Sequence, residues 1–122
     1  MATRVLVLGA GMVGGVMAAD LAEEPGFEVT IADVREENLA KASARAGGRV
    51  RTGRADLSSP AEIGRLAGGA DMVCGALASR LGFAALRAVI ESGRNYCDIS
   101  FMAEDALELD ELAKSRGVTA VV

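Results

Sequence analysis

The chain has 122 residues, enough for one domain with a single sizeable core. Its net charge of −4 argues against a nucleic-acid partner, and no apolar stretch reaches membrane-span length without a charge or a glycine. The start of the chain lacks the pattern of a signal peptide, so we expect a cytoplasmic protein. Without histidine, and with only Cys74 and Cys97 as thiols, the chain offers no set of residues from which we would expect a metal site.

The first predicted elements are a strand and a helix joined by a glycine-rich turn. Residues 4–8 are β-branched or leucine after an initial arginine, which predicts a buried strand. Gly9, Gly11 and Gly14 follow as G-x-G-x-x-G, and a helical pattern starts at Met12 and stops at Pro25. Strand, glycine turn and helix in this order are the context of a dinucleotide-binding fingerprint.

The turn and the first helical residues are the expected phosphate-binding group. The first glycine of such a motif permits the tight bend, the second lets a pyrophosphate approach the backbone, and the third brings the helix close to the strand. The helix start adds free N–H groups and a partial positive charge. The alternative is a tight turn that binds no ligand. The expected pyrophosphate ligands are Gly9, Ala10, Gly11, Met12, Val13 and Gly14.

An acid ends the second predicted strand, which covers residues 27–32. Asp33 lies about 20 residues beyond the glycine motif, the position from which an acid accepts hydrogen bonds from the adenosine ribose and repels a 2′-phosphate. We therefore expect NAD rather than NADP. Val34 and Arg35 follow, and Arg35 leaves NADP open because a nearby arginine accommodates a 2′-phosphate. The alternative role of Asp33 is to cap the next helix together with Glu36.

The third strand, expected over residues 50–55, follows a helix over residues 36–46. Asp56 and Leu57 come directly after it, at the edge of the sheet where ligands bind, and we expect Asp56 to contact the adenine amino group unless it is an ordinary turn acid. Ser59 and Glu62 then predict a capping box at the start of the next helix.

The fourth strand is expected over residues 71–77. The residues at and after its end, Ala76, Leu77 and Ala78, are expected to border the nicotinamide half of the cofactor, although Leu77 would equally suit the core. The remaining elements are a helix capped by Ser79, a strand over 95–99, a helix over 103–116 and a strand over 118–122.

Six strands alternating with five helices predict an α/β Rossmann fold. Its doubly wound six-stranded parallel sheet has the order 3-2-1-4-5-6, with right-handed crossovers and helices on both faces. We expect residues 1–122 to be an NAD(P)-binding domain that lacks a C-terminal substrate domain, because the chain stops on an apolar strand. Both cysteines lie in apolar strand patterns and are expected to be buried thiols.

Two motifs in the second half of the chain are more specific than the glycine fingerprint. They are G-A-L-A-S-R-L-G-F over 75–83 and N-Y-C-D-I-S-F-M-A-E over 95–104. Together with V-L-V-L-G-A-G-M-V-G near the start and E-L-A-K-S-R-G-V-T near the end, they resemble the saccharopine dehydrogenase-like family, closest to the lysine dehydrogenase type. The resemblance covers essentially the whole chain but only the family's N-terminal cofactor domain.

The resemblance implies an NAD(P)-dependent oxidoreductase that acts on lysine, saccharopine or a related amino acid. It also implies that Asp98, Ser100 and Phe101 line the boundary with a substrate domain, which would carry the catalytic residues. Many family members carry proline where this chain has Ala78. We expect a small amino-acid substrate and a homo-oligomer, with neither nucleic acid nor membrane as a partner, and no turnover by this chain alone.

Two other functions remain open at this point. One is a non-catalytic NAD-sensing regulatory module, in which the C-terminal edge forms a dimer surface. The other is a homo-oligomeric interaction domain without a cofactor.

Overall fold

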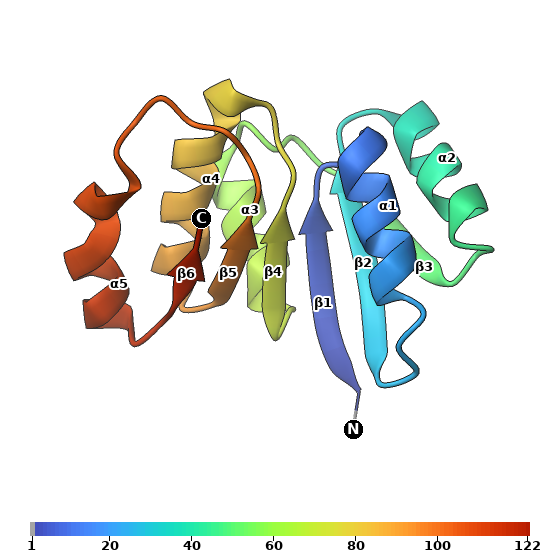
Figure 1. Ribbon diagram of the computed structural model, residues 1–122, viewed down its shortest axis with the longest axis horizontal. Helices are drawn as coiled ribbons and strands as arrows, with labels where there is room; N and C mark the ends of the chain where they lie inside the picture. Colours follow the sequence, from blue (N-terminus) through green and yellow to red (C-terminus); the bar gives the residue numbers. More distant parts are fainter. Residues whose placement is uncertain (1) are drawn as a thin grey trace.

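Six parallel strands form one sheet in the order β3-β2-β1-β4-β5-β6 in the computed structural model, which describes residues 2–122 (Figure 1). The strands are β1 (Thr3–Leu8), β2 (Phe27–Asp33), β3 (Val50–Arg54), β4 (Met72–Gly75), β5 (Asn95–Asp98) and β6 (Ala120–Val121). The helices are α1 (Met12–Leu21), α2 (Glu36–Arg45), α3 (Pro60–Gly68), α4 (Ser79–Glu91) and α5 (Asp110–Arg116), the last preceded by a 3₁₀ turn, η1 (Ala106–Leu109). The predicted Rossmann fold and strand order are confirmed.

The core lies on both faces of the sheet. In Figure 1, α1 and α2 lie in front of the sheet, and α3 and α4 lie behind it. Along β1, Leu6 and Leu8 belong to the cluster packed with α3 and α4, whereas Val5 and Val7 belong to the cluster packed with α1 and α2. Successive strand residues point to opposite faces, so a central parallel strand must be apolar throughout. Within β1, the four residues from Val5 to Leu8 meet that requirement, and all four are buried.

The buried face of α1 consists of its smallest residues. Gly14, Gly15 and Ala18 are buried, and a Cβ on Gly15 would lie 3.8 Å from the Cβ of Ala42 on α2. The two helices therefore pack too closely for a large side chain between them. Three of the apolar residues whose spacing predicts the helix are exposed instead: Met12, Val13 and Val16. Their spacing identified the helix but not the face that it buries.

Two predicted helix caps differ from the structure. The Ser59 hydroxyl accepts a hydrogen bond from the Glu62 N–H at 3.3 Å, as a capping box requires. The Glu62 carboxylate, however, accepts from the N–H of Asp56 and not from that of Ser59, so only half of the box forms. Ser79 is the first residue of α4 and not its cap, a position that Ala78 takes without a side-chain hydrogen bond.

The last strand–helix unit is shorter than predicted. The helix expected from residue 103 begins as a 3₁₀ turn after Asp105, whose carboxylate accepts a hydrogen bond from the N–H of Leu107. It ends at Gly117, which has a left-handed φ of 65°.

Of the two cysteines that were expected to be buried, only one is. Cys74 is buried, but its neighbour on β5, Cys97, is exposed, because α1 and α2 pack on the other half of that face of the sheet.

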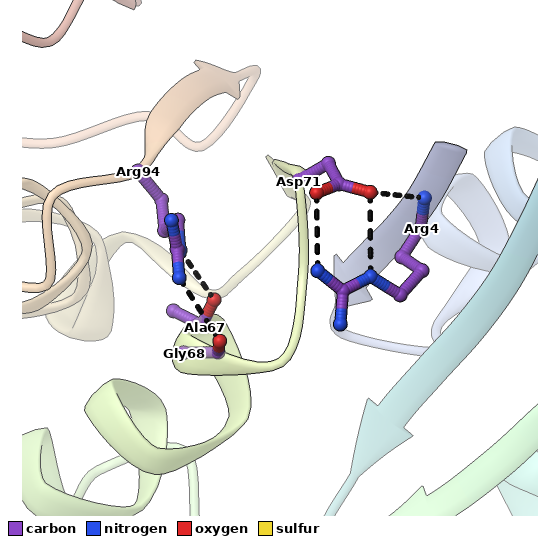
Figure 2. Close-up of polar contacts among 5 residues, drawn as sticks. All are labelled: Arg4, Ala67, Gly68, Asp71 and Arg94. Atoms are coloured by element: carbon purple, nitrogen blue, oxygen red, sulfur yellow. Dashed lines mark hydrogen bonds and ion pairs between the residues drawn. The ribbon is translucent and has the colours of Figure 1, made fainter. Parts of the chain in front are cut away.

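Two arginines make side-chain hydrogen bonds at the amino edge of the sheet (Figure 2). Arg4 donates to Asp71 from its backbone N, its Nε and its Nη2, at 2.8, 3.3 and 3.1 Å, and so fixes the start of β4 beside β1. Arg94 donates to the carbonyls of Ala67 and Gly68 at the end of α3, at 3.1 and 3.0 Å.

Among the helices of residues 2–122, none has the length and apolar character to cross a membrane.

Candidate functional site

Two of the three motif glycines are required by the fold itself. Gly9 has a φ of 101°, and a Cβ there would overlap the carbonyl oxygen of Ala76. A Cβ on Gly14 would overlap the carbonyl oxygen of Gly9. A Cβ on Gly11, by contrast, would meet no heavy atom within 4 Å. Gly11 therefore faces open space, which a ligand can enter.

The start of α1 leaves hydrogen-bond donors without partners. The first helical hydrogen bond runs from the N–H of Gly15 to the carbonyl of Gly11, at 2.9 Å. Within residues 2–122, no backbone or side-chain group accepts from the N–H groups of Met12, Val13 and Gly14, and the first turn carries no acid. Such a turn presents N–H groups and the positive end of the helix dipole to an anion. With the open space at Gly11, it fits a pyrophosphate.

The carboxylate of Asp33 is directed at the glycine turn. Its Oδ2 accepts from the N–H of Ala10 at 2.8 Å, and its Oδ1 accepts from the N–H of Arg35 at 2.8 Å. A carboxylate oxygen has two acceptor positions, so each can still accept from a hydroxyl. The residue at the cap position of α2 is Arg35, which makes no side-chain capping bond. The capping role considered for Asp33 with Glu36 is therefore not what the structure shows.

A hollow of about 340 Å³ lies at the carboxyl edge of the sheet, and we call it the carboxyl-edge hollow. Among its lining residues, those expected from the sequence are Gly9, Gly11, Asp33, Val34, Asp56, Leu57, Ala76, Leu77 and Ala78. The hollow thus brings together the glycine turn, the acid after β2 and the loops after β3 and β4. This edge is where ligands bind in open parallel sheets.

Sequence reasoning missed four lining residues: Asn38, Ser58, Arg80 and Leu81. Arg80 and Leu81 lie in the first turn of α4, directly after the loop that was expected to border the nicotinamide. Their position directly after that loop could have identified them as lining residues. Asn38 lies in the first turn of α2, and nothing in its residue type distinguished it from a solvent-facing helix residue.

Five of the expected residues do not line this hollow. Ala10 and Met12 line a second hollow of about 460 Å³ between α1 and α2, which shares Gly11 and Asn38 with the first and also contains Lys41 and Arg45. Val13, Gly14 and Arg35 line neither hollow. Gly14 is buried. The guanidinium of Arg35 pairs with Glu37 at 3.3 Å, with both side chains exposed.

Asp56 is a turn acid that also lines the hollow. Its Oδ1 accepts from the hydroxyl and the backbone N–H of Ser58, at 2.5 and 3.0 Å. These two hydrogen bonds hold the pKa of Asp56 below its usual range, so the side chain stays ionised. Leu57 faces the hollow with little of its surface, because it is buried in the core cluster packed with α3 and α4.

The three residues that the family resemblance places at a domain boundary differ in their exposure to solvent. Phe101 is 84% exposed, as a boundary residue would be. Asp98 is only 6% exposed, and its Oδ1 accepts from the N–H of Ser100 at 2.7 Å. Burial raises the pKa of Asp98, and hydrogen bonds from Ser100 oppose the rise. The Ser100 hydroxyl in turn accepts from the N–H of Leu77 at 2.8 Å.

The doubly wound parallel sheet, the glycine turn and the bare helix start together define a Rossmann domain. The family described as "Saccharopine dehydrogenase NADP binding domain" matches residues 5–121, and the chain belongs to that family. The predicted family resemblance is confirmed, while the closer likeness to the lysine dehydrogenase type stays a prediction.

Solved structures share this fold along almost the whole chain. Apo saccharopine dehydrogenase (L-Glu forming) from Saccharomyces cerevisiae superimposes with a TM-score of 0.82 at 21% identity, over 98% of this chain and 26% of that one. Biliverdin reductase from Synechocystis, in complex with biliverdin and NADP+, gives 0.74 at 19% identity, over 98% and 37%. Shikimate 5-dehydrogenase from Mycobacterium fortuitum gives 0.72 at 18% identity, over 98% and 44%. The chain therefore spans less than half the length of each of these proteins.

Proposed function

We propose that this chain is the NAD(P)-binding domain of a saccharopine or lysine dehydrogenase-like oxidoreductase, which transfers a hydride between a nicotinamide cofactor and an amino-acid substrate. The observation that carries the proposal is the row of unpartnered N–H groups at Met12, Val13 and Gly14 beside the open space at Gly11. A glycine turn that served only to connect strand and helix would not need both features. Asp33 lies at the same edge of the sheet.

The residues present fit each part of a dinucleotide. The first turn of α1 would bind the pyrophosphate, and Asp33 would accept hydrogen bonds from the adenosine ribose. Asp56 would accept from the adenine amino group, and the loop at 76–78 would border the nicotinamide. The bound nicotinamide supplies or accepts the hydride. The residues of this chain hold and orient it and keep water away from one side.

We propose NAD as the preferred cofactor, with NADP as the second. Asp33 supports this preference, because its carboxylate is fixed beside the expected ribose and would repel a 2′-phosphate. Arg35, the residue that would favour NADP, has Glu37 as an ion-pair partner. The family description and the cations Lys41 and Arg45 in the second hollow support NADP as an alternative.

The proposed substrate is a small amino acid held by residues outside this chain, in a cytoplasmic homo-oligomer. Two observations support a second domain. The chain covers only 26% of the yeast saccharopine dehydrogenase. Ile99 and Phe101, in the loop after β5, are exposed by 59% and 84%. An exposed apolar surface that a substrate domain would cover suits a dehydrogenase better than an NAD-sensing module. We expect no oxidation of L-lysine or saccharopine by the chain alone.

Isothermal titration calorimetry tests the proposal directly. We expect the chain to bind NADH, and to bind NADPH more weakly, while Gly11→Ala binds neither. ADP-ribose, which lacks the nicotinamide, should bind wild type through the adenine half of the site. Absence of heat with NADH, NADPH and ADP-ribose alike, from a folded chain, would contradict the proposal.

A further inference from the structure

Two loops at the carboxyl edge of the sheet are joined by a short chain of hydrogen bonds. The N–H of Ile99 donates to the carbonyl of Gly75 at 3.1 Å, which continues the pairing of β4 with β5. Beyond this point the Ser100 hydroxyl replaces the backbone as acceptor for the N–H of Leu77, at 2.8 Å. The N–H of Ser100 is itself fixed on Asp98 at 2.7 Å. The loop after β5 therefore holds the loop after β4.

The Asp98 carboxylate, from which this series of hydrogen bonds starts, lacks part of its hydrogen bonding. Asp98 is 6% exposed, and its Oδ2 has no hydrogen-bond partner within residues 2–122. The hydroxyl of Tyr96, which is fully buried, is also unpartnered there. Both side chains lie against Gly75, where a Cβ would overlap the Tyr96 hydroxyl. A buried, half-satisfied carboxylate is costly, so stability alone gives no reason for an acid at this position.

The loop held by Ser100 forms one wall of the carboxyl-edge hollow. Ala76, Leu77 and Ala78 all line it. Ala76, whose carbonyl occupies the space that a Cβ on Gly9 would need, is held separately, because its own N–H donates to the carbonyl of Leu8 at 2.9 Å. The adenosine end of the hollow is built by other elements, with Asp33 at the end of β2 and Asp56 after β3. A displacement of Leu77 would therefore alter one end of the hollow and spare the other.

We propose that Ser100, oriented by Asp98, is a positioning residue for the nicotinamide end of the site. Its hydroxyl fixes the N–H of Leu77 and thereby holds Leu77 and Ala78 where they border the nicotinamide. This inference rests on the proposed function, because it assigns a ligand to that end of the hollow. It gives the acid and the serine of the D-I-S-F segment a role inside this domain, in addition to any contact with a second domain.

The test compares two ligands on matched serine variants. Ser100→Ala removes the acceptor for Leu77, Ser100→Thr retains a hydroxyl, and Ser92→Ala removes a hydroxyl that bonds the Val89 carbonyl near the end of α4. NADH and ADP-ribose are titrated against each. We expect Ser100→Ala to weaken NADH binding by about 3- to 10-fold, the effect of one hydrogen bond, and to leave ADP-ribose within about twofold. Ser100→Thr should restore NADH binding, and Ser92→Ala should change neither ligand.

Hydrogen exchange of the ligand-free chain gives an independent readout. In Ser100→Ala the amide of Leu77 should lose about 3- to 10-fold of its protection, while the amide of Val73 in β4 keeps its own. Unchanged protection of Leu77, unchanged NADH binding, or equal loss of both ligands would each overturn the inference. Wild type that binds neither ligand would overturn the proposed function instead. If Ser100→Ala does not fold, Ser100→Cys replaces the hydroxyl with a somewhat larger thiol that is a weaker acceptor, and gives the same comparison.

Discussion

The Oδ2 of Asp33 accepts a hydrogen bond from the N–H of Ala10 at 2.8 Å, which joins the acid at the end of β2 to the glycine-rich turn after β1. Its Oδ1 is held by the N–H of Arg35 at the same distance. The two halves of the dinucleotide fingerprint are therefore joined by a hydrogen bond before any ligand binds. To make room for an additional phosphate, the carboxylate would have to give up both of these hydrogen bonds.

The charge of Asp33 should set the choice between NADH and NADPH. Asp33→Asn keeps an acceptor for the Ala10 N–H but removes the negative charge that would face a 2′-phosphate. We expect the ratio of the two dissociation constants to move toward NADPH by about tenfold or more, because a like-charge contact is costly. Calorimetry with both cofactors measures the ratio. Glu37→Gln, which frees Arg35 from its exposed ion pair, serves as a comparison. An unchanged ratio in Asp33→Asn would show that the carboxylate does not face the 2′ position.

Gly11 and Gly14 should respond differently to the same substitution. Gly11 has a φ of −71° and open space where a Cβ would be, so Gly11→Ala should fold with an unchanged melting temperature but lose dinucleotide binding. In Gly14→Ala the new Cβ would overlap the carbonyl of Gly9, and overpacking of this kind costs about 1–3 kcal/mol. Thermal unfolding and cofactor titration of both variants measure the two effects. Loss of stability in Gly11→Ala would show that this space is needed by the fold and not by a ligand.

The sequence predicted the fold well because each strand and helix carries a local signal that the packing does not override. The strand at residues 4–8, the glycine motif and Asp33 each occupy the position that their spacing predicted. Apart from two helix caps and the bounds of the last strand–helix unit, the errors concern side-chain surroundings. The exposure of Met12 and of Cys97 depends on how closely neighbouring helices pack and how far they extend, which no local pattern encodes. The contact between Ser100 and Leu77 joins residues 23 positions apart, and neither residue signals it alone.

The stability contributed at Asp98 should depend on pH. Burial raises the pKa of this carboxyl in the folded chain above its value in the unfolded chain. Below the unfolded value both states are protonated and burial is not penalised. As the pH rises through the folded value, the buried group ionises and the folded state loses stability relative to a neutral side chain. Asp98→Asn should therefore gain stability over wild type between acid and neutral pH.

Urea unfolding of wild type and Asp98→Asn across that pH interval measures the difference. A variant that is more stable at neutral pH, yet no better at binding NADH, would fit an acid retained for positioning and not for stability. A stability difference that stays constant with pH would show that Asp98 keeps the same protonation state throughout.

Arg94 should stabilise the domain without affecting the site. Its Nε and Nη2 donate to the carbonyls of Ala67 and Gly68, the last groups of α3 (Figure 2). These contacts lie at the amino edge of the sheet, whereas the hollow lies at the carboxyl edge. Arg94→Ala removes two charge-assisted hydrogen bonds and should cost about 1.5–3 kcal/mol of unfolding free energy, while NADH binding stays unchanged. Arg94→Lys should recover only part of the loss, because an ammonium cannot match the fork of a guanidinium. Arg87→Ala is the control, since Arg87 forms only an exposed pair with Glu91 and should cost less than about 0.5 kcal/mol. Equal losses from the two alanine variants would show that the contacts of Arg94 at the end of α3 add nothing beyond an ordinary surface charge.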